Sequence, residues 1–229
     1  MTDGHYIVAG KHDWVLQAFE SRQGSLPGKW SYCSTPEELD RILSSGVCPE
    51  RIFFIHWSWR VSSDLLSSTD CICFHMTDLP FGRGGSPLQN LILRGLDSTM
   101  LTALRMTDSI DAGPVYMKRE LSLTGSAQQI YMRVSALAMD MALEIIESNP
   151  EAIPQEGEPT MFERRRPSDS ELPNVENMKQ LYDFIRMLDA EGYPHAFIDR
   201  NGLRIEFTNA TLQGDSIVAS AKVEFAEKD

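Results

Sequence analysis

The sequence predicts an α/β fold in which a mostly parallel sheet is followed by a small C-terminal α+β extension. Short apolar runs alternate with segments of helical periodicity, which is the pattern of parallel strands joined by helical crossovers. Two of the runs are apolar almost throughout, as strands buried on both faces require. A proline-rich acidic segment at 149–159 then separates a larger domain, 1–150, from a connector with a C-terminal helix and β-strand subdomain, 151–229.

The first half of the chain supplies the alternation. A strand is expected at His5–Ala9, followed by a glycine turn and a helix within Gly10–Phe19, where apolar residues recur at helical spacing. Ser34–Leu39 offers a hydroxyl N-cap and an early proline, which open a second helix. The two nearly continuous apolar runs are Arg51–Trp57 and Asp70–His75, and we expect both to be buried strands.

The next elements surround a loop with two carboxylates. Pro87–Leu93 suits the start of a helix, and Thr99–Met106 and Val115–Leu121 are expected strands on either side of the loop Thr107–Gly113. Ser126–Ser148 is the strongest helix, because its apolar residues form one stripe.

The tail is expected to hold one helix and two strands. The helix covers Val175–Ala190, and residues alternate with period two around Leu203–Phe207 and within Ser216–Phe225. The apolar side chains of the last strand would either cover the subdomain's own sheet or pair with a second chain, which leaves a homodimer open. The basic run Arg164–Arg166 is expected to be a charged face.

The composition excludes several classes of protein and partner. With 42% hydrophobic and 24% charged residues among 229, the chain is an ordinary globular protein. Its 21 Lys and Arg against 33 Asp and Glu give a net charge of −12. Because that charge repels phosphate backbones and anionic lipid surfaces, we expect neither nucleic acid nor membrane as a partner.

Targeting and cysteine patterns indicate a cytoplasmic protein. No apolar run approaches the roughly 20 residues that cross a bilayer, and the first residues lack the pattern of a secretory signal. The four cysteines are too scattered for a disulfide framework and lack a zinc-binding spacing, so we expect reduced thiols and no metal. They are Cys33, Cys48, Cys71 and Cys73.

His75 and Asp111 are the candidate acid and base. His75 stands at the expected end of a strand, where the ligand crevice of an open α/β sheet lies, and Asp111 stands in the carboxylate loop. A carboxylate beside an imidazole fixes the orientation and tautomer that acid/base catalysis requires. A histidine at a strand end also fits a structural role, and sequence spacing alone does not bring the two side chains together.

Three further segments have both a binding and a structural interpretation. Gly82 and Gly84 let a ligand approach the backbone or only form turns, and Arg83 between them binds an anion or is solvated. Gly10-Lys11-His12 opens a helix, where backbone amides favour a diphosphate, although the spacing matches no dinucleotide or P-loop motif. The indoles of His56–Trp59 wall a planar ligand or pack in the core.

Two loop motifs occur in a specific order. The first is Cys73-Phe-His75-Met-Thr-Asp-Leu79-Pro80-Phe-Gly-Arg83-Gly84, and the second is Thr107-Asp108-Ser-Ile-Asp111-Ala-Gly113-Pro114. Together they resemble the Asn-x-His, Leu-Pro, Arg-Gly motif and the Thr-Asp-x-x-Asp-x-Gly-Pro motif of formyltransferases that use N10-formyltetrahydrofolate. The resemblance implies a Rossmann-like sheet, the formyltransferase fold, with the catalytic domain in 1–150.

The resemblance also implies roles for the loop residues. His75 resembles the catalytic histidine and Asp111 the catalytic aspartate, with no metal and no covalent enzyme intermediate. The expected assignment has Asp111 shuttling protons while His75 stabilises the oxyanion, and the reverse assignment stays open. Cys73 stands at the position of the family asparagine, whose amide polarises the formyl group, a role that a thiol fills poorly.

The tail resembles the nucleotide-sugar branch of the family. Phe162–Leu172 and Leu181–Phe197 are similar to segments that follow the catalytic domain in that branch, and the first loop looks most like the pseudaminic acid pathway enzymes that formylate UDP-4-amino-4,6-dideoxy-N-acetyl-altrosamine. Only about 60 residues follow the connector, too few for the C-terminal barrel of a tRNA enzyme. Alternatives are formylation of a carrier-bound aminoacyl group, or an inactive folate or nucleotide-sugar binder.

The resemblance therefore implies an enzyme with two binding sets around the catalytic pair. The set expected to bind folate contains Trp57, Ser58, Trp59, Met106, Asp108 and Asp111. The set expected to bind the diphosphate of a nucleotide-linked amino sugar contains Gly10, Lys11, His12, Arg83 and Gly84.

Overall fold

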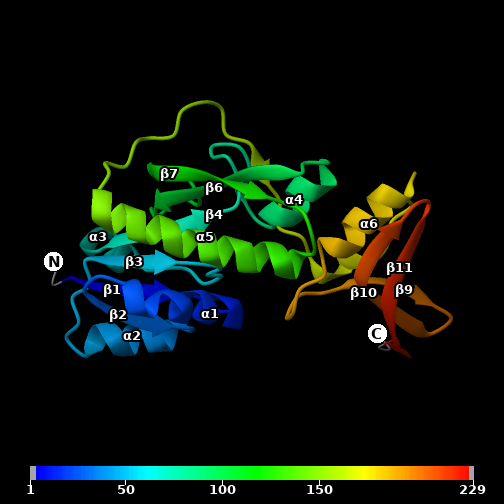
Figure 1. Cartoon of the computed structure of the whole chain (residues 1–229), viewed down its shortest axis with the longest axis horizontal. Coiled ribbons are helices and arrows are strands. Elements are labelled where there is room, and N and C mark those ends of the chain that lie inside the picture. Colours follow the sequence, from blue (N-terminus) through cyan, green and yellow to red (C-terminus); the bar gives the residue numbers. More distant parts are fainter. Residues whose placement is uncertain (1–3, 227–229) are drawn as a thin grey trace. The chain divides into compact units, whose positions relative to one another are not determined.

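The computed structural model of the chain describes residues 4–226, and these form two compact units (Figure 1). The first unit contains residues 4–84, Met100–Leu121 and Tyr131–Met161, and the second contains Gly85–Thr99, Ser122–Ile130 and 162–226. Both units draw on separate stretches of sequence, and the linear division into 1–150 and 151–229 stays a prediction.

A six-stranded sheet with the order β2-β1-β3-β4-β6-β7 forms the frame of the candidate site. β1 pairs in parallel with β2 and β3, β3 pairs in parallel with β4, and β4 pairs antiparallel with β6. The expected mostly parallel α/β sheet is confirmed. Its strands are β1 (His5–Ala9), β2 (Lys29–Cys33), β3 (Arg51–Phe54), β4 (Asp70–His75), β6 (Ser98–Arg105) and β7 (Val115–Ser122).

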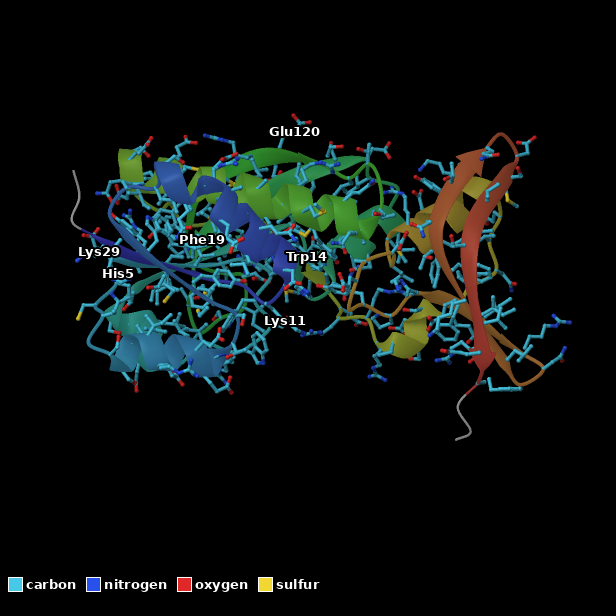
Figure 2. All side chains as sticks on the ribbon, turned by 60° about the horizontal axis from the view of Figure 1, so that its bottom comes forward. His5, Lys11, Trp14, Phe19, Lys29 and Glu120 are labelled. Atoms are coloured by element: carbon cyan, nitrogen blue, oxygen red, sulfur yellow. The ribbon has the colours of Figure 1, made fainter. Side chains whose placement is uncertain are left out.

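Helices cover both faces of this sheet. α1 (Asp13–Arg22) and α5 (Ala127–Ser148) share one face, where Trp14 stacks on Tyr131 and Arg22 pairs with Asp140. Trp14 and Phe19 lie on α1, with Lys11 in the turn before it (Figure 2). α2 (Pro36–Ser44) and α3 (Ser63–Ser68) pack against the apolar cluster on the other face. A short 3-10 helix at Gln23–Ser25 follows α1.

The N-terminal hydroxyl cap predicted for α2 forms in the structure. The hydroxyl of Thr35 accepts a hydrogen bond from the Glu38 N–H, and the Glu38 carboxylate accepts from the backbone and hydroxyl of Ser34. This reciprocal cap satisfies amide groups that the helix itself leaves unpaired. The predicted hydroxyl cap is therefore confirmed, and the capping residue, Thr35, is the second residue of the predicted segment Ser34–Leu39.

The second unit is built around an antiparallel sheet with the order β11-β10-β9. α6 packs against β10 and β11 (Figure 1). The buried guanidinium of Arg186 pairs with Asp183 and donates to the carbonyls of Leu123 and Gly125, which satisfies a charge that burial would otherwise penalise. The elements are α4 (Pro87–Leu93), the 3-10 helix Pro167–Ser170, α6 (Met178–Arg186), β9 (Ala196–Arg200), β10 (Leu203–Gln213) and β11 (Ser216–Phe225).

Several boundaries differ from the sequence predictions for local reasons. The strand expected at Arg51–Trp57 stops at Phe54, because His56 adopts a positive φ of 51° that breaks the extended backbone. The helix expected at Val175–Ala190 begins only at Met178, because the Asn177 side chain caps it. Strand β9 and helix α3 are not among the predicted elements, because their sequences carry no strong signal.

Two further findings bear on the expected partners and compartment. Along residues 4–226, no helix is both long and apolar enough to cross a membrane. Val223 and Phe225 of β11 are exposed, so these side chains do not cover the unit's own sheet, and the homodimer stays a prediction.

Candidate active site

The pairing of β4 with β6 brings the two loop motifs together. β4 carries Cys73 and His75, and its antiparallel partner β6 places Leu104 opposite Cys73 and Thr102 opposite His75. Because β6 runs antiparallel to β4, the carboxylate loop leaves the sheet beside the start of β4, and Asp111, later in this loop, reaches His75 at the other end of that strand. The amide of Met106 donates to the Cys71 carbonyl at 2.7 Å and fixes the start of the loop.

His75 and Asp111 face each other. His75 is 8% exposed, and its Nε2 lies 2.7 Å from the Gly82 carbonyl oxygen. Because a carbonyl only accepts hydrogen bonds, Nε2 carries a hydrogen. The other ring nitrogen, Nδ1, lies 3.5 Å from Asp111 Oδ2, so the two groups form an ion pair when the ring carries both protons. The imidazole is thus held at both nitrogens.

Asp111 is held in an uncommon backbone conformation. Its φ is 50°, in the left-handed region that aspartate tolerates better than most residues. The carboxylate oxygen Oδ2, which faces His75, also accepts the Gly84 N–H at 2.9 Å. Gly113 follows in the same loop, and a Cβ there would lie 1.8 Å from the Arg105 carbonyl oxygen, so only glycine fits.

Gln155 joins the two loops and was not among the predicted site residues. Its Nε2 donates to the carbonyls of Asp111 and Gly113, both at 2.8 Å, and its Oε1 accepts from Arg83 Nε and Nη2 at 3.1 and 2.8 Å. A single glutamine in a proline-rich segment carries no sequence signal of such a role. Arg83 is therefore committed to this bridge.

A cavity of about 480 Å³ opens beside the pair. Its walls include the indoles of Trp57 and Trp59, whose ring centroids are 4.8 Å apart, and the thiol residue Cys73. All six residues of the expected folate set line this one cavity, which are Trp57, Ser58, Trp59, Met106, Asp108 and Asp111. Asp108 also accepts a hydrogen bond from the Ser63 hydroxyl at 2.6 Å, which ties the loop to α3.

Cys73 contributes a neutral thiol to this cavity. Burial raises the pKa of the Cys73 thiol, and the nearby Asp111 carboxylate raises it further. The group therefore stays protonated at neutral pH, where a thiol is only a weak hydrogen-bond donor. It offers neither a thiolate nucleophile nor the strong amide donor of the family asparagine.

The residues expected to bind a sugar diphosphate are not brought together. Lys11 lines a different cavity of about 470 Å³, with Tyr32 and Arg41. Gly10 is needed for packing, because a Cβ there would lie 2.4 Å from Val15 Cγ1, and the His12 ring stacks on Trp14 with centroids 4.2 Å apart. The other members of the set, Arg83 and Gly84, contact Gln155 and Asp111 instead.

No metal cluster is found in the described part of the chain, where no group of three or more His, Cys, Asp or Glu side chains could hold an ion.

Comparisons with known proteins identify related sequences. Residues 167–224 match the family model of the methionyl-tRNA formyltransferase C-terminal domain. The methionyl-tRNA formyltransferase of Ehrlichia ruminantium (strain Gardel) is 26% identical over 191 residues, 81% of this chain and 61% of that protein. The chain thus spans about 61% of the length of this curated relative.

Solved structures extend the comparison. The methionyl-tRNA formyltransferase from Clostridium thermocellum is 38% identical, with a TM-score of 0.93 over 97% of this chain and 100% of that chain. HypX from Aquifex aeolicus, solved in complex with tetrahydrofolic acid, has a TM-score of 0.75 at 15% identity over 91% of this chain and 38% of that chain. The HypX likeness shows the fold alone.

These findings overturn two expectations. The expected nucleotide-sugar acceptor is wrong, because the relatives are methionyl-tRNA formyltransferases and the expected diphosphate set is divided between two places. The expectation that nucleic acid is no partner is wrong for the same reason. The net charge of −12 is an average over the whole surface. The C-terminal segment, expected to be too short for a tRNA enzyme, matches the C-terminal domain of such enzymes over residues 167–224.

Proposed function

The chain belongs to the formyltransferase family, and on this premise we propose that it transfers a formyl group from N10-formyltetrahydrofolate to the amino group of methionyl-tRNA. Formyltransferases use this folate as donor. The observation that carries the proposal is the buried His75–Asp111 pair beside a cavity lined by all six residues of the expected folate set.

The cavity suits the donor by size and by lining. Its volume of about 480 Å³ lies within the roughly 300–1,000 Å³ of ordinary small-molecule sites. Flat indoles at Trp57 and Trp59 favour a planar ring, and the polar loop of Asp108 offers backbone and carboxylate partners to a pterin. In the proposed arrangement the formyl group of the donor lies at the His75–Asp111 end.

The proposed reaction needs only proton transfers by side chains. The neutral amine attacks the formyl carbon, the bond from that carbon to N10 breaks, the amine loses a proton and N10 gains one. Asp111 is the proposed proton carrier, because its Oδ2 faces the His75 ring and accepts a hydrogen bond from the Gly84 N–H.

His75 is the proposed donor to the oxyanion. Its Nε2 is bound to Gly82 at 2.7 Å, whereas the Nδ1 contact to Asp111 is longer at 3.5 Å. When the ring carries both protons, the Nδ1 proton is the one more easily shared with a developing negative oxygen. Since Cys73 is a poor substitute for an amide donor, the oxyanion depends more on His75 here than in a site with the asparagine.

The proposed acceptor rests on the relatives. Support comes from the match of residues 167–224 to a methionyl-tRNA formyltransferase domain and from the similarity to the Clostridium thermocellum structure over its full length. Three consecutive arginines, Arg164–Arg166, come directly before the matched segment and supply local positive charge for a phosphate backbone.

The acceptor is tested with radiolabelled formyl donor. The protein is incubated with the donor and, in separate reactions, methionyl-tRNA, uncharged tRNA or free methionine, and label is counted in the precipitated RNA and, after chromatography, in the soluble amino acid. We expect label on methionyl-tRNA alone, in a form released as formylmethionine by mild base. Absence of label on methionyl-tRNA, while folate still binds, would contradict the proposed acceptor.

A further inference from the structure

We propose that Gln155 is a positioning residue that sets the distance between Asp111 and His75. The inference rests on the proposed formyl transfer and adds a residue that lies outside both loop motifs. The amide of Gln155 uses both of its ends: the nitrogen donates to the Asp111 and Gly113 carbonyls, and the oxygen accepts from Arg83.

The segment that contains Gln155 is anchored on both sides of this residue. Two residues before it, Ile153 exchanges backbone hydrogen bonds with Val115 at 2.7 and 2.9 Å, which anchors the segment to β7. Farther along, the Thr160 carbonyl accepts from the amides of Gly82 and Arg83. The segment that contains Gln155 is therefore held against the sheet and against the first loop.

The two carbonyls that Gln155 binds lie where the second loop has least freedom. Asp111 has a positive φ, and Gly113 packs against the backbone of Arg105 with no room for a side chain. A residue held in a sparsely populated conformation persists only when its surroundings fix it. Gln155 supplies two hydrogen bonds to this turn, and the Gly84 N–H supplies a third through the carboxylate.

The expected consequence is catalytic. If the hydrogen bonds from Gln155 are lost, the turn can relax toward commoner backbone angles, and the carboxylate moves relative to the ring. Displacements of about 1 Å at reacting groups lower rates by roughly a hundredfold. Donor binding depends mainly on the indoles and the cavity wall, so it should change little.

The test replaces Gln155 with Met, which keeps the length of the side chain and removes both polar ends. We expect Gln155→Met to lower kcat by about 10- to 100-fold while the KM for N10-formyltetrahydrofolate changes less than about threefold. Gln155→Glu keeps the acceptor for Arg83 but opposes two carbonyls with a carboxylate oxygen, so its kcat should fall at least as far. Gln17→Met, on the exposed face of α1, is the matched control.

A double-mutant cycle distinguishes a bridge from two separate effects. Because Arg83 acts through Gln155, we expect Arg83→Met with Gln155→Met to lose no more than about twofold beyond Gln155→Met alone. If the kcat losses of the two single variants multiply in the double variant, the bridge is contradicted. If Gln155→Met fails to fold, as judged by circular dichroism, the Arg83→Met and Gln155→Glu variants carry the same test.

Hydrogen exchange supplies a readout that does not depend on turnover. The Gly84 amide, which donates to Asp111, should exchange faster in Gln155→Met than in the wild type, with unchanged exchange along β1. If the wild-type protein transfers no formyl group, the proposed function is contradicted, whereas the predicted change in Gly84 exchange still applies. A wild type that transfers formyl, with a Gln155→Met variant within twofold of its kcat and its Gly84 exchange, would overturn the positioning role.

Discussion

Two cavities of the first unit are almost equal in volume, about 480 and about 470 Å³, yet of these two only the first has Asp111 in its wall. Beside the first, the Asp111 carboxylate is oriented by a histidine and an amide N–H. In the second, Tyr32 donates to the Gly10 carbonyl at 2.5 Å and Glu38 caps α2.

The comparison shows that volume and charged residues do not identify a site in this molecule. What differs is how the polar groups are used. In the second cavity Tyr32 completes a turn and Glu38 completes a helix end, whereas at Asp111 the surrounding hydrogen bonds fix the orientation of a carboxylate.

The largest expected effect is that of removing the imidazole. His75→Ala should lower kcat by roughly 10²- to 10⁴-fold, because it removes a proton donor and the partner of Asp111. Arg41→Met, which alters the wall of the other cavity, should change kcat less than about twofold. If single-turnover formylation shows equal losses of rate in the two variants, the two cavities do not differ in their importance for the reaction.

The second effect concerns the turn that presents Asp111. In Gly113→Ala the new Cβ would lie 1.8 Å from the Arg105 carbonyl oxygen, so the backbone must shift. We expect a loss of about 1–3 kcal/mol in the free energy of unfolding, as for overpacked sites, and a kcat reduced by roughly a hundredfold. Urea unfolding and steady-state kinetics check both values, and an active variant with wild-type kcat would show that the turn need not be exact.

The third effect is a pH dependence of stability that comes from His56. Burial lowers the pKa of His56 from its ordinary value of 6.5 to about 4, and its ring contacts those of His12, Trp14 and Tyr131. Because the unfolded chain binds this proton below pH 6.5 and the folded chain only below about 4, stability is lost as pH falls through that window. The expected loss between pH 7 and 5 is about 2 kcal/mol.

His56→Asn tests this prediction, since asparagine tolerates the positive φ of 51° at this position. Urea unfolding of both proteins at pH 7 and pH 5 should give a smaller difference for the variant. His12, whose pKa is lowered first by burial and then by Lys11, keeps part of the dependence in both proteins. The same pH dependence in the variant would mean that His56 does not titrate as described.

The smallest effect belongs to the cap of α2. Thr35→Ala removes the hydroxyl that accepts from Glu38 and should lower the free energy of unfolding by about 1 kcal/mol. Since this cap borders the second cavity, kcat should stay unchanged. A kcat that falls with the cap would assign the second cavity to the reaction after all.

Much of the fold could be predicted because the signals were local. The runs His5–Ala9 and Asp70–His75 became strands with those bounds, and Pro87–Leu93 became a helix, since hydrophobic period and proline position act over a few residues. The end of β3 was missed because a single residue with positive φ decides it, and β9 because its short segment has little alternation.

The candidate site was predictable to the extent that its residues belong to ordered motifs. Asp111 and the other residues of the folate set line one cavity, His75 faces Asp111, and the roles of all of them stay predictions. Gln155 could not be found, because its function depends on a backbone turn 42 to 44 residues away in sequence. The diphosphate set does not come to one place, because strand ends look alike in sequence, whereas their side-chain partners are set only by tertiary contacts.

The most direct test of the comparison is a crystal structure of the protein with bound tetrahydrofolate. We expect the pterin between Trp57 and the Asp108 loop, with N10 facing His75 and Asp111. Tetrahydrofolate in the cavity of Lys11 and Tyr32, or bound with N10 away from the pair, would contradict this expectation.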